Sequence, residues 1–178
     1  MADENLVHYL RHSAGALGTF VAIAILTPLL LASILGQSVP VTLALMGSTF
    51  VIEYGAAPVG IAGGLPPAFV LLVLSCIALG VSLLLFNLCE PLGEHSSWFA
   101  RFLERNRTRA QASPLCAKYG IFSLVPLVMI LGFYVCAPVA WVFGWQRSHA
   151  LLLIMAGYLA ACLVTILATM GLLGIPLP

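Results

Sequence analysis

The chain has 178 residues, of which 62% are hydrophobic and only 7% are charged, and its formal net charge is +1 at pH 7. Soluble domains carry about 25% charged residues, so this composition excludes a soluble globular enzyme, a disordered tail and a collagen-like fibre. Basic residues form no tract dense enough to bind nucleic acid. The sequence predicts an all-α integral membrane protein, with residues 1–178 as a single membrane domain.

Three apolar stretches are long enough to cross a bilayer as helices, which takes about 20 residues. They run over Ala14–Gly36, Ala68–Leu88 and Ala150–Leu173. The first exceeds the apolar core of a cleaved signal, so we expect it to be retained as an extra N-terminal helix over residues 14–36. Pro28 lies inside this helix and is expected to bend it, because its ring removes one backbone hydrogen bond.

Two further apolar segments, Val41–Pro67 and Tyr119–Trp145, are interrupted by glycine and proline. These residues disfavour helix interiors by about 1 and 3 kcal/mol respectively, so neither segment is expected to form a straight helix. Broken backbone at membrane depth is tolerated only against protein or a wet cavity. The residues expected to shape the tips of two hairpins are Gly55, Pro58, Gly60, Pro126, Gly132 and Pro138.

Basic residues indicate how these segments thread. Arg11 precedes the first span, a basic cluster lies within the loop over residues 90–118, and Arg147 precedes the third span. The positive-inside rule favours all of them on the cytoplasmic side, which requires each broken segment to enter and leave on one side. At about 1.5 Å per residue, such a segment suffices for a re-entrant hairpin but not for two crossings. The alternative, in which each broken segment is a full span, separates Arg147 from the cluster.

An inverted repeat follows from the first threading. One half covers residues 41–89 and the other covers residues 119–173, each with a re-entrant hairpin followed by a full span. The two hairpins enter from opposite sides, a pattern that points to a transporter site near the midplane. The same threading places the N-terminus in the cytoplasm, and we expect a multi-pass protein of the inner (cytoplasmic) membrane.

The loop over residues 90–118 is the only long polar stretch. From Ser96 to Ala110, aromatic and apolar residues lie on one helical face, and Arg101, Arg105 and Arg109 recur at four-residue spacing. This pattern is typical of an interfacial helix whose arginines contact anionic lipid headgroups. The helix either only fixes the topology or also binds lipid for regulation.

Glu53 is the most informative single residue. It is the only Asp, Glu, Lys or Arg between Arg11 and Glu90. A charge at bilayer depth costs about 2.5–3.5 kcal/mol on insertion scales, so such a residue is a functional-site candidate by default. A protonatable carboxyl beside a Gly/Pro break predicts a proton or substrate site. The other interpretation is a carboxylate that backbone amides cap or that water reaches.

No catalytic residue, metal ligand or cofactor is predicted. The five cysteines form no CxxC pair, and cysteine often acts as a small buried hydrophobe. Of the four histidines, His8, His12 and His149 are expected at the headgroup level. The chain contains no HExxH, GxSxG or Walker sequence, so we do not expect an enzyme.

The stretch over residues 52–62, with Glu53, Pro58 and Gly60, resembles the signature of the small multidrug export protein family. That signature reads Glu, any residue, Arg-Gly-Ala-Ile-Pro, any residue, Gly. The resemblance covers about residues 41–173 and extends distantly to the DedA-like membrane proteins. It implies paired re-entrant hairpins and movement of lipid carriers or small solutes.

Two departures from the family pattern leave an alternative function open. Gly55 stands where the signature has Arg, and the Pro-Gly turn of the second hairpin is missing from the sequence around Pro126. The first hypothesis is a secondary transporter or lipid-carrier translocase, proton-coupled through Glu53. The alternative is a non-catalytic structural subunit of a larger membrane complex. The expected partners are membrane lipids, with a homodimer or complex partners also open.

Overall fold

The computed structural model describes residues 13–95 and 120–173 of the chain. Within these residues every regular element is a helix, as the sequence predicts. The elements in chain order are η1 (Val21–Leu26), α2 (Thr27–Ile34), α3 (Val39–Ile52), η2 (Glu53–Ala56), α4 (Ala57–Ala62), α5 (Pro67–His95), η3 (Gly120–Ser123), α8 (Leu124–Leu131), α9 (Phe133–Val142) and α10 (Arg147–Leu173).

Among the described residues, four helical stretches are long and apolar enough to cross a membrane. Ser13–Ile34, Pro67–Cys89 and Arg147–Leu172 correspond to the three predicted spans. The fourth stretch, Val39–Ala62, is the first Gly/Pro-broken segment, and η2 interrupts it at Glu53.

The first helix contains an irregular turn directly before Pro28. Residues Val21–Leu26 are π-helical, and the Thr27 hydroxyl donates to the Ala22 carbonyl, five residues earlier, at 2.9 Å. The Thr27 backbone N–H donates to the same carbonyl. A π-helical turn uses this wider spacing, and it lies where the proline ring takes one donor out of the helix.

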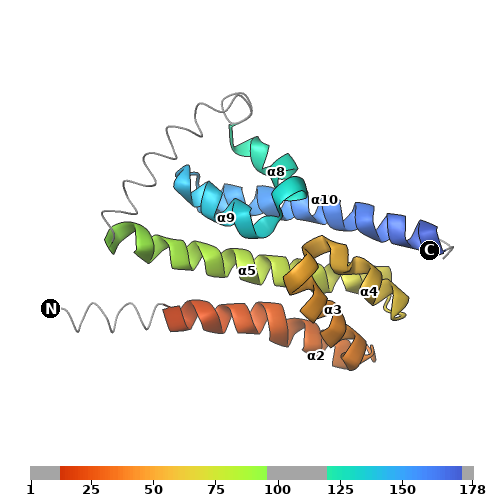
Figure 1. Ribbon diagram of the computed structural model, residues 1–178. Coiled ribbons are helices and arrows are strands. Elements are labelled where there is room, and N and C mark those ends of the chain that lie inside the picture. The colour runs from red at the N-terminus through yellow and green to blue at the C-terminus, as the bar shows by residue number, and fades with distance from the viewer. Residues whose placement is uncertain (1–12, 96–119, 174–178) are drawn as a thin grey trace.

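The break at Glu53 turns the chain back on itself. A Cβ added at Gly63, just after α4, would overlap the side chain of Val41 near the start of α3. A Cβ at Gly60 would lie 3.1 Å from Leu45 Cδ2, one turn farther along α3. The two helices therefore run antiparallel, and their outer ends lie together (Figure 1). Small residues allow this close approach.

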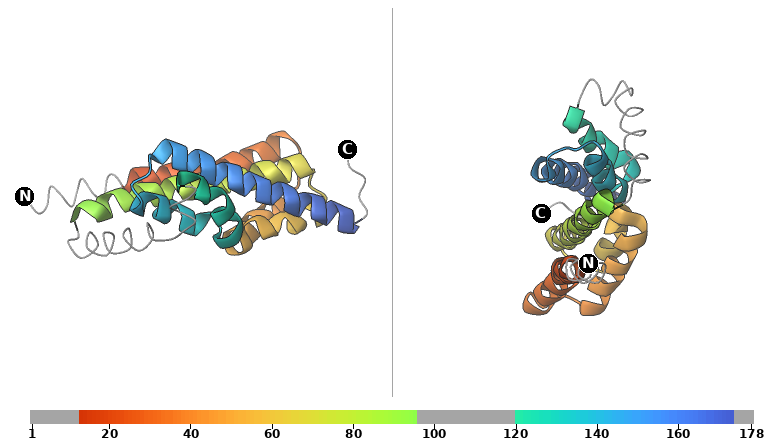
Figure 2. Two further views of the ribbon diagram at one scale, coloured as in Figure 1. Left: turned by 90° about the horizontal axis from the view of Figure 1, so that it is seen from above. Right: turned by 90° about the vertical axis from the view of Figure 1, so that its left-hand side faces the viewer.

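The long helices form one layer and the broken pairs form another. Seen end-on in Figure 2, α5 lies between α2 and α10, and α3, α4, α8 and α9 lie to one side of them. A Cβ added at Gly80 of α5 would meet the Ala24 Cβ at 2.9 Å, so the first helix packs closely on α5. The hydrophobic core lies between the two layers.

The end of α5 and the start of α10 lie at the same end of the bundle (Figure 1). The Arg147 guanidinium donates to Asn87 Oδ1 at 2.7 Å and lies over the Phe86 ring, 5.9 Å from its centroid. Asn87 lies near the C-terminal end of α5. Arg147 therefore lies at the bundle end where α5 ends.

Large apolar side chains cover much of the surface. Ile34 is 77% exposed, Leu152 is 67% exposed and Leu172 is 89% exposed. Soluble monomers rarely expose apolar patches of more than a few hundred Å². Together with the four apolar helical stretches, these surfaces indicate a multi-pass membrane protein.

Candidate functional site

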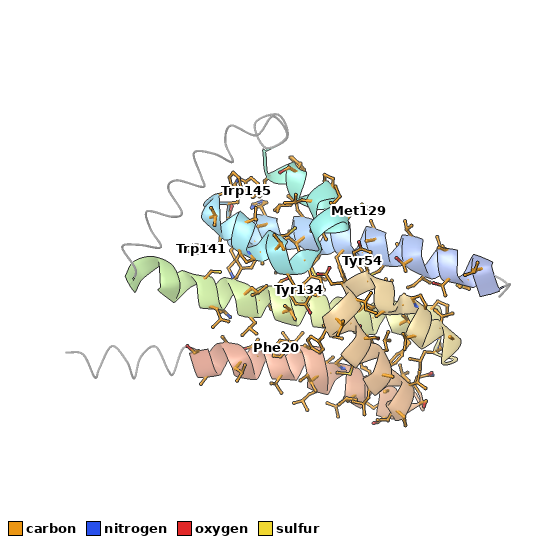
Figure 3. The ribbon with its side chains drawn as sticks, in the orientation of Figure 1. Phe20, Tyr54, Met129, Tyr134, Trp141 and Trp145 are labelled. Atoms are coloured by element: carbon orange, nitrogen blue, oxygen red, sulfur yellow. The ribbon has the colours of Figure 1, made fainter. Side chains whose placement is uncertain are left out.

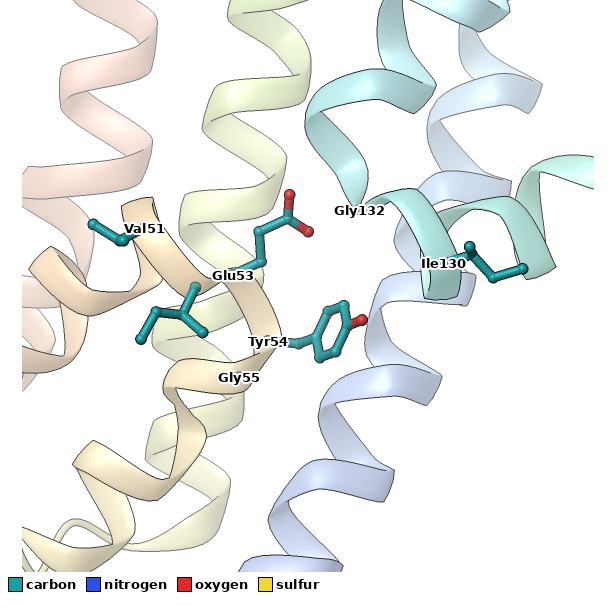
Figure 4. A pocket seen from close by; sticks show the side chains of 7 residues that line it. Val51, Glu53, Tyr54, Gly55, Ile130 and Gly132 are labelled. Atoms are coloured by element: carbon teal, nitrogen blue, oxygen red, sulfur yellow. The ribbon is translucent and has the colours of Figure 1, made fainter.

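The first break is centred on Glu53. Its φ is 54° and its ψ is −127°, and it is the only non-glycine residue with positive φ in the described part of the chain. Holding a side chain in such a conformation costs about 1–3 kcal/mol, so the surroundings must stabilise it. The strain directs the carboxylate away from α3 and toward the second broken pair (Figure 4).

The second break is centred on Gly132. Its φ is 78° and its ψ is 173°, a conformation that is almost restricted to glycine. A Cβ added here would overlap both carboxylate oxygens of Glu53. Glycine is therefore required at position 132 for two reasons: the backbone conformation, and the close approach of the Glu53 carboxylate.

The Glu53 carboxylate caps the N-terminus of α9. The Phe133 backbone N–H donates to Glu53 Oε2 at 3.3 Å. Helix N-termini carry unpaired N–H donors and a partial positive charge, so they stabilise a carboxylate. This hydrogen bond joins the two broken pairs across 80 residues of sequence.

Two tyrosines join the broken pairs reciprocally. The Tyr54 hydroxyl donates to the Met129 carbonyl of α8 at 2.9 Å. The Tyr134 hydroxyl donates to the Phe50 carbonyl of α3 at 3.1 Å. Each carbonyl lies in the last turn before a break, and each tyrosine closely follows the other break. Figure 3 labels Tyr54, Met129 and Tyr134. We call the three hydrogen bonds made by Glu53, Tyr54 and Tyr134 the junction.

Tyr158 packs against two of the residues at the junction, Phe133 and Tyr54. It lies near the middle of α10, it is 0% exposed, and its ring centroid is 5.0 Å from that of Phe133 and 6.4 Å from that of Tyr54. Its hydroxyl interacts with the Cys162 side chain, one turn along α10, and among the described residues it makes no hydrogen bond to either broken pair. Because the middle of α10 packs here, the junction lies near half-depth of the helical layer.

Removing either junction hydroxyl should destabilise the fold. We expect Tyr54→Phe and Tyr134→Phe each to lower the free energy of unfolding by about 0.6–2 kcal/mol, the range for hydrogen bonds between membrane helices. Thermal unfolding in detergent measures this. Tyr158→Phe is the matched control, because among the described residues its hydroxyl makes no hydrogen bond to either broken pair. An equal loss in the control would show that the junction hydrogen bonds do not carry the effect.

An open cleft of about 430 Å³ lies at the junction (Figure 4). The half-buried Glu53 carboxylate and Gly132 lie at its base. Its rim is apolar: Val51 is 82% exposed, Ile52 is 57% exposed and Ile130 is 77% exposed. The lining consists of Val51, Ile52, Glu53, Tyr54, Gly55, Ile130 and Gly132.

The structure brings together some of the predicted site residues and separates others. Glu53, Gly55 and Gly132 line the cleft. Pro58 lies in the first turn of α4, and Gly60 lies farther along it, packed against Leu45 and Val70. Pro126 lies in the first turn of α8 and Pro138 inside α9, away from the break itself.

The predicted contacts with lipid headgroups lie outside the described residues. Arg101, Arg105 and Arg109, the expected headgroup contacts, are outside the described ranges. Within those ranges, no group of three or more His, Cys, Asp or Glu is placed to hold a metal ion.

Sequence reasoning missed four contributors to the site: Tyr54, the Phe133 N–H, Tyr134 and Tyr158. Buried tyrosines usually find a hydrogen-bond partner. A tyrosine in an otherwise apolar segment is therefore the signal that could have identified three of them. No sequence signal identifies a backbone N–H.

Comparison with known proteins identifies a family. Residues 53–164 match the family described as "Putative small multi-drug export protein". The match begins at Glu53 and covers both sides of the junction. No curated protein and no solved structure gives a significant match to the chain. Because the matched region is well over half of the sequence, the chain belongs to the small multi-drug export protein family.

Proposed function

We propose that this protein is a secondary transporter of the inner membrane. Glu53 takes up and releases a proton, and this proton movement is coupled to movement of the solute. The family description, an export protein, supports transport rather than an enzymatic reaction. The observation that carries the proposal is the position of the Glu53 carboxylate, which lies in an open cleft where two broken helix pairs meet.

Two re-entrant hairpins in an inverted repeat are the architecture that we propose for this transporter. The α3–α4 pair folds back and leads into α5, and the α8–α9 pair leads into α10. The reciprocal hydrogen bonds of Tyr54 and Tyr134 are what a two-fold relation between the halves produces. The contact of Arg147 with Asn87 supports a cytoplasmic location for that end of the bundle, and the positive-inside rule then places the N-terminus there too.

Charge on Glu53 controls how firmly the junction is held. An ionised carboxylate accepts the Phe133 N–H and is attracted to the positive end of α9. Protonation removes that charge, so the two hairpins are held together less strongly. The junction is therefore strong when Glu53 is ionised and weak when it is protonated. Alternating access requires an element with two such states.

Glu53 is the one group at the junction suited to this exchange. The titratable side chains that interact with it electrostatically are Tyr134, Cys136, Tyr158 and Cys162. Tyrosine and cysteine ordinarily titrate above neutral pH, whereas a carboxyl group can take up and release protons as its surroundings change. The carboxylate also disfavours an anionic lipid-phosphate carrier as the solute, because like charges repel.

Glu53→Gln should abolish proton-coupled flux while leaving the fold intact. The glutamine amide keeps an oxygen that accepts the Phe133 N–H but cannot exchange a proton. The assay uses the full chain in liposomes with trapped pyranine and a pH gradient, to which ethidium, uncharged chloramphenicol or anionic fluorescein is added. We expect at least one probe to trigger proton movement in the wild type and none to do so in the variant.

Glu90→Gln near the end of α5 is the matched control and should keep the flux. Equal proton movement by wild type and Glu53→Gln contradicts the proposal. A wild type that moves protons with none of the probes, and that is purified with other polypeptides in fixed ratio, favours the accessory-subunit alternative.

A further inference from the structure

We propose that the Glu53 cleft opens sideways into the bilayer and binds a lipophilic organic cation of single charge. This inference rests on the proposed transport function and adds the class of its solute and the route by which the solute arrives.

The rim of the cleft is exposed at a depth where the surroundings are lipid. Val51, Ile52 and Ile130 are apolar and all more than half exposed. Tyr54, which lines the same cleft, packs on Tyr158 near the middle of α10, far from both of its ends. An apolar opening at that depth admits molecules that have already partitioned into the bilayer, and it disfavours small hydrated ions.

The charge at the base selects a cation. Glu53 carries the only acidic side chain that lines the cleft. Of the seven Lys and Arg residues in the chain, only Arg147 lies in the described ranges, and it contacts Asn87 and Phe86 at the end of the bundle. The α9 N-terminus supplies only a partial positive charge, about half a unit. One carboxylate with no full positive charge beside it among the described residues therefore complements one positive charge.

Size and lining extend the match beyond charge. A volume of about 430 Å³ is within the range of drug-sized ligand sites. Tyr54 also lines the cleft (Figure 4), and the faces of aromatic rings attract organic cations. The cleft thus offers an anion, an aromatic ring and apolar walls, which together favour a bulky, weakly hydrated cation.

The first test is equilibrium binding of radiolabelled tetraphenylphosphonium to the detergent-purified full chain. Unlabelled tetraphenylphosphonium should compete. Tetramethylammonium, which has the charge without the apolar body, and triphenylphosphine oxide, which has the body without the charge, should not. We expect Glu53→Gln to weaken binding by about tenfold or more, because the ligand loses the only full charge that it meets. Glu90→Gln should bind like the wild type.

Equal affinity of Glu53→Gln and the wild type overturns the inference, and so does competition by the uncharged oxide as strong as that by the cation. Binding of a lipid phosphate in place of the cation overturns it too. Failure of the transport proposal looks different: the cation binds in a Glu53-dependent way, but no probe moves protons in liposomes. Coupled flux of the uncharged probe without cation binding leaves transport standing and refutes only the solute class.

The second test concerns the sideways opening. Benzoylphenylalanine at position 51 or 130 is activated by light in native lipid, and the products are identified by mass spectrometry. We expect crosslinks to lipid acyl chains from both positions. The same group at Ile154, which is 0% exposed in α10, is the control and should crosslink only within the chain. Crosslinks from both rim positions to a second copy of the chain would show that protein closes the opening, and would overturn this part of the inference.

Discussion

Gly132→Ala should be among the most destabilising single substitutions in this protein and should abolish transport. Two costs act together. The backbone at Gly132 has φ 78° and ψ 173°, where a residue with a Cβ is strained by about 1–3 kcal/mol. The new methyl group would also overlap both oxygens of Glu53. Displacing that carboxylate leaves a polar group without its partner, which costs a further amount of about 1–3 kcal/mol.

Gly144→Ala separates these two costs. Gly144 also has a positive φ, 66°, but a Cβ there would meet nothing within 4 Å. It should therefore show the backbone strain alone and keep its transport activity. Thermal unfolding and flux, measured on both variants, test the expectation. If Gly132→Ala is no worse than Gly144→Ala, the approach of Glu53 to Gly132 does not contribute to stability.

Gly157→Ala should separate α8 from α10. A Cβ at Gly157 would lie 2.8 Å from the Val125 carbonyl oxygen and 3.1 Å from the Val125 Cα. Both are backbone atoms, so neither can rotate away, and the two helices must move apart. Overpacking of this kind costs about 1–3 kcal/mol. Because α8 carries the carbonyl that Tyr54 bonds, we expect the junction to weaken and flux to fall as well.

Gly171→Ala is the control for this substitution. It lies in the same helix, and a Cβ there would meet nothing within 4 Å. Alanine favours a helix interior over glycine by about 1 kcal/mol, so this control should be neutral or slightly stabilising. Equal unfolding temperatures for Gly157→Ala and Gly171→Ala would contradict the close packing of α8 on α10.

The helix N-terminus provides a physical account of one departure from the family signature. The stretch that follows Glu53 lacks the arginine of that signature, which removes a cationic partner for Glu53. In the structure, the carboxylate instead meets the Phe133 N–H at the start of α9. A helix N-terminus stabilises an anion without a full opposite charge. Glu53 thus keeps a partner while the cleft keeps its negative charge.

The elements that could be predicted from sequence are those that depend on local composition. Long apolar stretches identify α5 and α10, and a lone charge in an apolar segment singles out Glu53. Gly132 lies in the cleft because the second break needs a backbone conformation that glycine adopts readily. These features can be predicted without knowing which helices pack against one another.

The rest of the site depends on contacts between distant segments. The pairing of Glu53 with the Phe133 N–H spans 80 residues and involves a backbone group, which every residue except proline has. The two junction tyrosines bond carbonyl groups, which also carry no sequence signature. Pro138 was expected near a hairpin tip but lies inside α9, because Gly132 alone supplies the break.

Infrared difference spectroscopy of the full chain in lipid tests directly whether Glu53 loses its proton when the cation binds. The spectrum with saturating tetraphenylphosphonium is compared with the spectrum without it, at a pH where the carboxyl group is partly protonated. The account predicts that the cation removes a protonated-carboxyl band in the wild type and in Glu90→Gln, and that this change is absent in Glu53→Gln. The same carboxyl change in Glu53→Gln would contradict the account, because the proton would then come from another group.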